Sequence, residues 1–175
     1  HTSISLWSDT AAKSPLKQRV RLNLAYAYQQ EGYMQDAIRE YHSGLALYPD
    51  NEVTGRTNRL LATMNIGQIY LRLGRPDQAL DVMAAEWNAD PGFPGLAVNM
   101  GMAFGMVGQP DLAVSVLSMG IANLPAYPWF TDPGRLYFNR GAAYTLIGQC
   151  EKARSDFQMA ANLDPDFSGI VPVCS

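Results

Sequence analysis

The 175-residue chain has few of the residues on which most catalytic and metal sites depend. Its two cysteines are too few for a disulfide-rich framework and lack the spacing of zinc ligands. Of its two histidines, His1 is terminal, and His42 follows the packing residue Tyr41 and is expected at the solvent edge. No phosphate loop, serine elbow or H-E-x-x-H motif is present. The sequence therefore predicts no enzyme activity, no catalytic residue, no metal site and no cofactor.

Basic clusters and long apolar runs are missing as well. The net charge is −3, and no run of five or more basic residues offers the positive surface that nucleic acid requires. No apolar stretch approaches the roughly 20 residues of a membrane-spanning helix. We therefore expect a protein or peptide partner, with no nucleic acid and no direct membrane contact by this chain.

What the sequence does contain is one pattern that occurs four times, each time around a glycine. A small residue precedes each glycine by seven positions and an aromatic residue by four, while an alanine follows by five and a proline by seventeen. The glycine should end a first helix in the left-handed conformation, and the proline should end a second helix. The glycines are Gly32, Gly74, Gly108 and Gly148, with the aromatics Tyr28, Tyr70, Phe104 and Tyr144, the small residues Ala25, Gly67, Gly101 and Gly141, the alanines Ala37, Ala79, Ala113 and Ala153, and the prolines Pro49, Pro91, Pro125 and Pro165.

This pattern resembles the tetratricopeptide repeat, in which pairs of helices stack because one pair cannot bury its own apolar stripe. The resemblance implies an all-α fold, a right-handed α-α superhelix whose first helices line a concave groove. We predict one domain, 1–175, with a leading half-repeat helix at 3–14 and a tail at 168–175. The four repeats are expected at 18–51, 60–93, 94–127 and 134–167.

The repeats depart from the pattern in two ways. Glu86 and Arg140 stand where a small or an apolar residue is usual. The glycine spacings are 42, 34 and 40 residues, so extra residues precede the second repeat ("NEVTGRTN") and the fourth ("PWFTDP"). We expect these insertions to extend loops or to lengthen a first helix. The aromatic residues of the longer stretch "PAYPWFTDP" around the second insertion, Tyr127, Trp129 and Phe130, are expected to pack rather than to anchor a partner.

An asparagine stands nine residues before each turn glycine, at a position that should face the groove. Because an amide offers a donor and an acceptor, a ladder of asparagines suits an extended peptide backbone, and similar ladders occur in relatives of O-linked N-acetylglucosamine transferase. The alternative is that these amides hold neighbouring first helices together. The ladder comprises Asn23, Asn65, Asn99 and Asn139.

Apolar residues are expected around the ladder, and methionines among them would adapt to varied partners. For about half of them the alternative is packing beneath neighbouring helices. The basic candidates are few and include no lysine, so a groove that clamps a terminal carboxylate is not expected. The predicted walls comprise Tyr26, Met64, Met102 and Phe138, with Leu22, Leu71, Val98 and Met106 beside them and Arg19, Arg72 and Arg135 as the basic candidates.

The two cysteines lie near the C-terminus, Cys150 at the start of the last second helix and Cys174 next to the end. That helix should span about 20 Å, and an extended tail after Pro165 reaches up to about 30 Å, so a disulfide between them is within reach. Two free thiols are the alternative, and an oxidising compartment would favour the disulfide.

The lead-in "SLWSDTAAKSPLKQRVRLNLAYAYQQEG" resembles the junction in bacterial polytopic membrane proteins, relatives of transmembrane O-mannosyltransferases, that carry extracytoplasmic tetratricopeptide tails. The resemblance implies a membrane span upstream of His1 and a periplasmic location, with a cytoplasmic location as the alternative. We therefore expect a peptide-binding module. The alternatives are an acceptor-recruiting domain of a membrane glycosyltransferase and a structural assembly scaffold.

Overall fold

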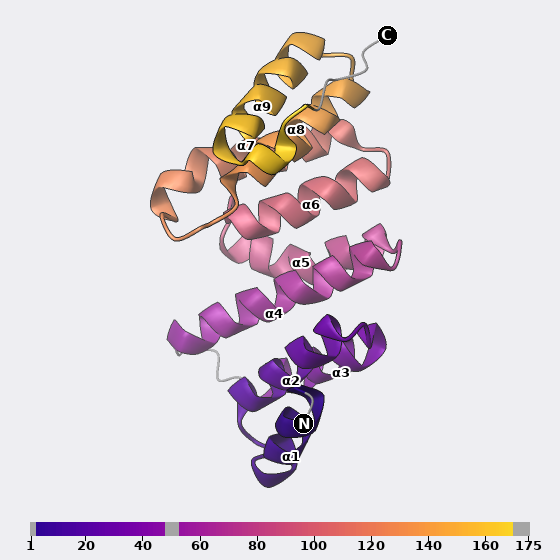
Figure 1. The fold of residues 1–175 in the computed structure, drawn as a ribbon, viewed down its shortest axis with the longest axis vertical. Coiled ribbons are helices and arrows are strands. Elements are labelled where there is room, and N and C mark those ends of the chain that lie inside the picture. The colour runs from indigo at the N-terminus through magenta and orange to yellow at the C-terminus, as the bar shows by residue number, and fades with distance from the viewer. Residues whose placement is uncertain (1–2, 48–52, 170–175) are drawn as a thin grey trace. The chain divides into compact units, whose positions relative to one another are not determined.

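The computed structural model describes residues 3–47 and 53–169, and within these ranges every regular element is a helix (Figure 1). This confirms the all-α class. The α-helices are α1 (Ser3–Lys13), α2 (Gln18–Gln30), α3 (Met34–Ala46), α4 (Val53–Arg72), α5 (Pro76–Ala89), α6 (Pro94–Met106), α7 (Pro110–Asn123), α8 (Pro133–Leu146) and α9 (Cys150–Leu163), and the short 3₁₀ helices are η1 (Leu124–Ala126) and η2 (Pro165–Phe167).

The chain forms two compact units, which we describe separately: unit 1, His1–Leu73, and unit 2, Gly74–Ser175. The predicted single domain therefore stays a prediction. In unit 1, α1 packs on α2, α2 pairs with α3, and α4 contacts both α2 and α3. Ala11 of α1 is buried together with Val20 and Leu24 of α2, and Trp7 packs against this cluster. Helix α1 thus confirms the predicted leading half-repeat helix.

In unit 2, α6 pairs with α7 and α8 pairs with α9, while α5 packs on α6 and α7 packs on α8. The first helices of these two hairpins, α6 and α8, also contact each other. A small residue is required where the helices of a hairpin come close. A Cβ atom added to Gly101 of α6 would lie only 2.5 Å from Leu117 of α7. The hairpins of unit 2 therefore stack in sequence order.

The four turn glycines adopt the left-handed conformation that the pattern predicts, with φ values of +84° at Gly32, +69° at Gly74, +74° at Gly108 and +72° at Gly148. At Gly108 the hydrogen bonds are those of a Schellman cap. The Gly108 amide donates to the Gly105 carbonyl (3.2 Å), and the next amide, of Gln109, donates to the carbonyl of Phe104 (2.8 Å). The aromatic residue of the pattern therefore also supplies a carbonyl that closes the helix end.

The two insertions have different outcomes. The first lengthens a helix, since α4 has 20 residues where α2 has 13. The second lengthens a loop, because α7 ends at Asn123 and α8 begins only at Pro133. Helices α5, α7 and α9 each end two residues before the predicted proline, whereas Pro49 lies outside the described residues.

Among the described helices, none is at once long and apolar enough to cross a membrane.

Candidate functional site

Unit 1 contains a pocket of about 210 Å³ between α2 and α4, with α3 contributing one side chain. Two asparagines of the predicted ladder, Asn23 and Asn65, line it together with the predicted wall residue Tyr26. The sequence-based placement of these three residues is therefore consistent with a shared site. The lining residues are Arg19, Leu22, Asn23, Tyr26, Tyr41, Asn58, Leu61, Ala62 and Asn65.

A buried hydrogen-bond network supports this pocket. Tyr41 reaches it from α3, and its hydroxyl donates to the Gln29 side-chain oxygen at 2.8 Å. The Gln29 amide in turn donates to Gln68 of α4 at 3.2 Å. Burial raises the pKa of Tyr41 well above its ordinary value, and an interaction with the Asn65 side chain acts in the opposite direction. Tyr41 therefore remains a neutral donor that joins the three helices.

Asn58 is a lining residue that the sequence pattern did not identify. It lies in the first insertion, and its side-chain amide donates to the Gln18 side-chain oxygen at 2.9 Å. The Gln18 amide nitrogen is itself buried and has no hydrogen-bond partner. Asn58 precedes Asn65 by seven residues, which is about two turns of helix. Once α4 is known to be continuous, this spacing places both amides on one face.

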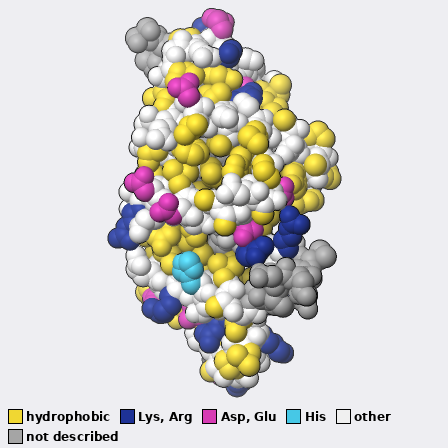
Figure 2. Space-filling model, turned by 180° about the vertical axis from the view of Figure 1, so that it is seen from behind, with side chains coloured by type: hydrophobic (Ala, Val, Ile, Leu, Met, Phe, Trp, Pro, Cys, Tyr) yellow, Lys and Arg dark blue, Asp and Glu magenta, His cyan; other side chains and the backbone are white. Residues whose placement is uncertain are grey.

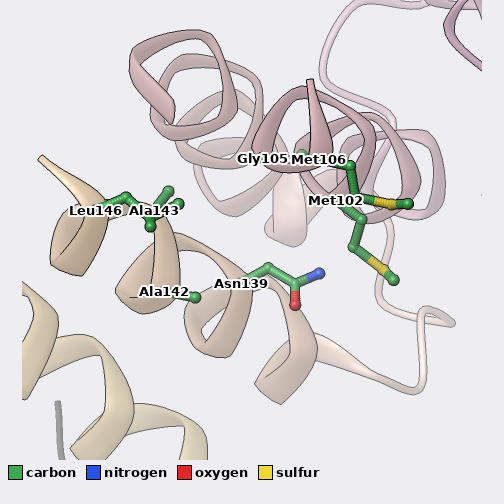
Figure 3. A pocket seen from close by; sticks show the side chains of 8 residues that line it. Met102, Gly105, Met106, Asn139, Ala142, Ala143 and Leu146 are labelled. Carbon is green, nitrogen blue, oxygen red and sulfur yellow. The ribbon is translucent and has the colours of Figure 1, made fainter. Parts of the chain in front are cut away.

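Unit 2 contains a second pocket, of about 270 Å³, between α6 and α8 (Figure 3). Met102 and Asn139 were predicted to face a groove, and both line this pocket. No charged residue is among the lining residues, in contrast to the pocket of unit 1. They are Gly101, Met102, Gly105 and Met106 from α6 and Asn139, Ala142, Ala143 and Leu146 from α8.

The polar group of the α6–α8 pocket is the Asn139 amide. Figure 3 shows it extending from α8 toward the Met102 side chain of α6. Its nitrogen, Nδ2, is buried and has no hydrogen-bond partner. Because an unsatisfied buried donor is costly, this amide gains free energy from any acceptor that reaches it.

Three more predicted groove residues line these pockets, Arg19 and Leu22 in unit 1 and Met106 in unit 2. The remaining predicted residues line neither pocket. Asn99 is buried (9 % exposed), and Met64 is half-buried on α4. Phe138 was assigned to the groove, but its ring stacks on Phe167 at 5.0 Å and lies 5.5 Å from Phe157 of α9. The Phe138 side chain thus packs toward α9 and η2 in an aromatic stack, and its assignment to a peptide groove stays a prediction.

Arg140, which departs from the repeat pattern, has a structural partner. It forms two hydrogen bonds with the Asp156 carboxylate, from Nε at 2.7 Å and from Nη2 at 2.8 Å, and a third with the Ser118 hydroxyl at 3.1 Å. The hydrogen bonding with Asp156 raises the pKa of Arg140. The guanidinium also lies over the rings of Tyr137 and Tyr144. Arg140 therefore joins α7, α8 and α9.

Tyr127 and Trp129, in and beside the second insertion, contact other aromatic rings of unit 2. The Tyr127 hydroxyl donates to the Asp90 carboxylate at 2.8 Å, and its ring lies edge-on to Phe93 at 5.1 Å. Trp129 contacts both rings, with centroid distances of 5.8 Å to Phe93 and 5.9 Å to Tyr127, yet it remains 59 % exposed. The prediction of packing is thus confirmed for Tyr127, and Trp129 covers the outside of the cluster.

Hydrophobic side chains are exposed elsewhere on unit 2. Leu112 and Met119 of α7 and Met159 and Leu163 of α9 are all more than a third exposed. On the face of unit 2 seen in Figure 2, hydrophobic side chains form a broad area with few charged groups between them. Exposure alone therefore does not distinguish the α6–α8 pocket. Its hollow shape and its unpartnered amide do.

Other kinds of site find little support. In the described part of the chain, no group of three or more His, Cys, Asp or Glu side chains is placed to hold a metal ion. Cys150 begins α9, but Cys174 lies outside the described residues. The disulfide between them therefore stays a prediction.

Stacked helical hairpins with left-handed glycine turns define a helical-repeat protein, and comparison with known families gives its class. The tetratricopeptide repeat model matches residues 18–51, 62–85 and 134–167, which is more than half of the chain. The chain belongs to the tetratricopeptide repeat family. The third predicted repeat, 94–127, lies outside these matches, but α6 and α7 form its helical pair.

Solved structures agree with this fold. MamA (AMB-1) is 20 % identical, with a TM-score of 0.69 over 93 % of this chain and 88 % of that one. A chain of the APC/C hetero-tetramer Cut9–Hcn1 is 15 % identical, with a TM-score of 0.74 over 93 % of this chain and 30 % of that one. YrrB, a TPR protein with an unusual peptide-binding site, is 15 % identical, with a TM-score of 0.66 over 93 % of this chain and 77 % of that one.

The curated relatives are much longer than this chain. RNA polymerase II-associated protein 3 from Mus musculus is 27 % identical over 110 residues, which are 63 % of this chain and 16 % of that protein. The Homo sapiens protein is 25 % identical over 128 residues, which are 71 % of this chain and 18 % of that protein. The chain thus spans less than a fifth of the length of these relatives.

Proposed function

We propose that this chain is a peptide-binding module, and that the pocket of unit 1 and the pocket of unit 2 each take an extended segment of a protein partner. The tetratricopeptide repeat fold implies protein or peptide partners, and it serves as an interaction scaffold. One observation most directly supports the proposal that these pockets bind a peptide. Residues chosen from the sequence for a peptide groove, Asn23, Asn65 and Tyr26, line one pocket, and Asn139 and Met102 line the other.

Further support comes from chemistry and from a structural neighbour. The unit 1 pocket presents amide and hydroxyl groups suited to a peptide backbone, and the unit 2 pocket presents methionines that adapt to apolar side chains. YrrB, which shares the fold, is described as having an unusual peptide-binding site. The module would act without chemistry of its own, in keeping with the lack of catalytic motifs in the sequence.

The test begins with peptides selected on the intact 1–175 chain from a phage-displayed library of short random sequences. Fluorescence anisotropy with labelled synthetic copies then gives affinities for wild type and for Asn23→Ala/Asn65→Ala. We expect the double variant to bind about thirtyfold more weakly, since two hydrogen bonds of about 1 kcal/mol each are lost. Asn88→Ala, at an exposed position of α5, is the matched control. Failure to select any peptide on the wild-type chain would refute the proposal.

We also propose an extracytoplasmic setting, in which the chain recruits protein acceptors for a membrane glycosyltransferase encoded upstream. The proposal rests on the lead-in sequence and on the pair Cys150 and Cys174. Intact-mass measurement of the protein purified from a periplasmic fraction, before and after reduction and alkylation, tests it. Two thiols that alkylate without prior reduction would contradict this setting.

A further inference from the structure

Gly105, in the last turn of α6, has no packing role that explains it. A Cβ atom added there would meet no atom within 4 Å, unlike one added at Gly101. Its φ is not positive, so the backbone does not require glycine either. Glycine inside a helix lowers stability relative to alanine. What the missing side chain does provide is space, because Gly105 lines the α6–α8 pocket.

The size of this pocket restricts what it holds. Its volume is about 270 Å³, below the roughly 300–1,000 Å³ of pockets that take drug-sized ligands or cofactors. Opposite Gly105, α8 contributes the small residues Ala142 and Ala143. The rim carries flexible apolar side chains, with Met106 51 % and Leu146 65 % exposed. The dimensions suit one side chain of a peptide better than a whole small molecule.

The charges of the pocket restrict its occupant further. None of its eight lining residues is charged. Arg135 lies one turn before Asn139 on α8, but its guanidinium is paired with Asp132 at 2.6 Å. A charged side chain would therefore lose its hydration without gaining a counter-charge. The wall offers one polar complement, the Asn139 Nδ2 donor, which has no partner. It matches a neutral acceptor such as a peptide carbonyl.

Together these observations specify the occupant. We propose that the α6–α8 pocket binds a single uncharged apolar side chain of an extended peptide, that Gly105 keeps the pocket open for it, and that Asn139 Nδ2 donates to the peptide carbonyl beside it. This inference rests on the proposed function, whose own test is whether the wild-type chain binds peptides at all.

The first test variant fills the pocket with a side chain of the protein itself. Gly105→Leu places a leucine side chain where the peptide side chain would sit, and the helix tolerates leucine well. Peptides selected on wild type should carry an apolar residue whose replacement by alanine weakens binding about tenfold. Gly105→Leu should weaken binding to a similar extent, and in this variant the alanine replacement in the peptide should have little further effect. Ser155→Leu, at an exposed position of α9, controls for added apolar surface.

A second variant addresses the donor. Asn139→Asp keeps the shape of the side chain but replaces the Nδ2 donor with an oxygen, so the same peptides should bind at least tenfold more weakly. Circular dichroism verifies that each variant stays folded. Peptides that bind wild type and Gly105→Leu equally would overturn this inference alone and leave the proposed function standing. Absence of any peptide that binds wild type would overturn both.

Discussion

At the residue scale, Arg140 occupies a first-helix position that is apolar in the other repeats, where Leu24, Ile66 and Met100 stand. The Asp156 carboxylate that it neutralises is buried, with the residue 5 % exposed. We predict that Arg140→Met lowers the free energy of unfolding by about 3 kcal/mol, because it leaves a buried charge without a partner. Urea unfolding followed by circular dichroism measures this.

The matched control for that prediction is Arg154→Met, which breaks a pair with Glu151 whose side chains are 64 % and 85 % exposed. Its effect should stay below about 1 kcal/mol. The double variant Arg140→Met/Asp156→Met should recover most of the loss, since no unpaired charge remains. Equal losses for Arg140→Met and Arg154→Met would contradict the assignment of a buried, stabilising pair.

Tyr41 predicts a pH dependence of stability. An unfolded tyrosine ionises near pH 10, whereas burial raises the pKa of Tyr41 in the folded chain. The folded state therefore holds one proton more above pH 10, so its stability is complete below pH 10 and declines as pH rises further. Tyr41→Phe should remove this decline, and Tyr33→Phe, at an exposed position, should retain it. Urea unfolding at several pH values between about 8 and 11 gives the free energy of unfolding of both variants as a function of pH. If this free energy declined with pH equally in the two variants, the prediction would be refuted.

At the scale of the helices, two kinds of glycine have opposite roles. Gly148 ends α8 with φ +72°, and a Cβ atom there would meet nothing, so Gly148→Ala should cost about 1 kcal/mol through backbone strain alone. Gly105→Ala, where φ is not positive, should instead raise stability by about 0.5 kcal/mol. The free energies of unfolding of the two variants test this prediction. A change of the same sign in both variants would contradict the opposite roles assigned to Gly148 and Gly105.

The two insertions show how much of the helix lengths is determined by the local sequence. The insertion "PWFTDP" contains two prolines, which interrupt helical hydrogen bonding, and the structure has a loop there. The insertion "NEVTGRTN" contains none, and its described part from Val53 is helical. The number of extra residues alone is compatible with a loop or a longer helix for both insertions. The proline content distinguishes the two insertions. It therefore also indicates that Asn58 belongs to a continuous helix α4 and lies on its pocket face.

For the whole molecule, helical repeats couple mainly to their neighbours. We predict that Arg140→Met reduces amide protection in α7, α8 and α9 much more than in α2 and α3, because the lost pair joins the last three helices of unit 2. Hydrogen exchange with mass spectrometry measures both units in one sample. A uniform loss of protection across the chain would show instead that units 1 and 2 unfold as one cooperative body.

The candidate site was predictable in part. The position nine residues before a turn glycine lines a pocket for Asn23, Asn65 and Asn139, because helix periodicity alone sets which face a residue occupies. The same rule does not apply to Asn99, which lines neither pocket, or to Phe138, which lies in the aromatic stack with Phe157 and Phe167. Periodicity gives the face of a helix but not the neighbours that cover it.

The amino-acid sequence by itself determined the helical class, the repeat and the ends of the helices, because these depend on backbone preferences of glycine and proline and on local hydrogen bonds. Only the tertiary structure decided that Tyr41 reaches a pocket from a second helix, that Arg140 pairs with Asp156, and that Asn139 keeps a donor without a partner. These features depend on side chains from different helices, whose meeting is set by packing and not by spacing along the chain.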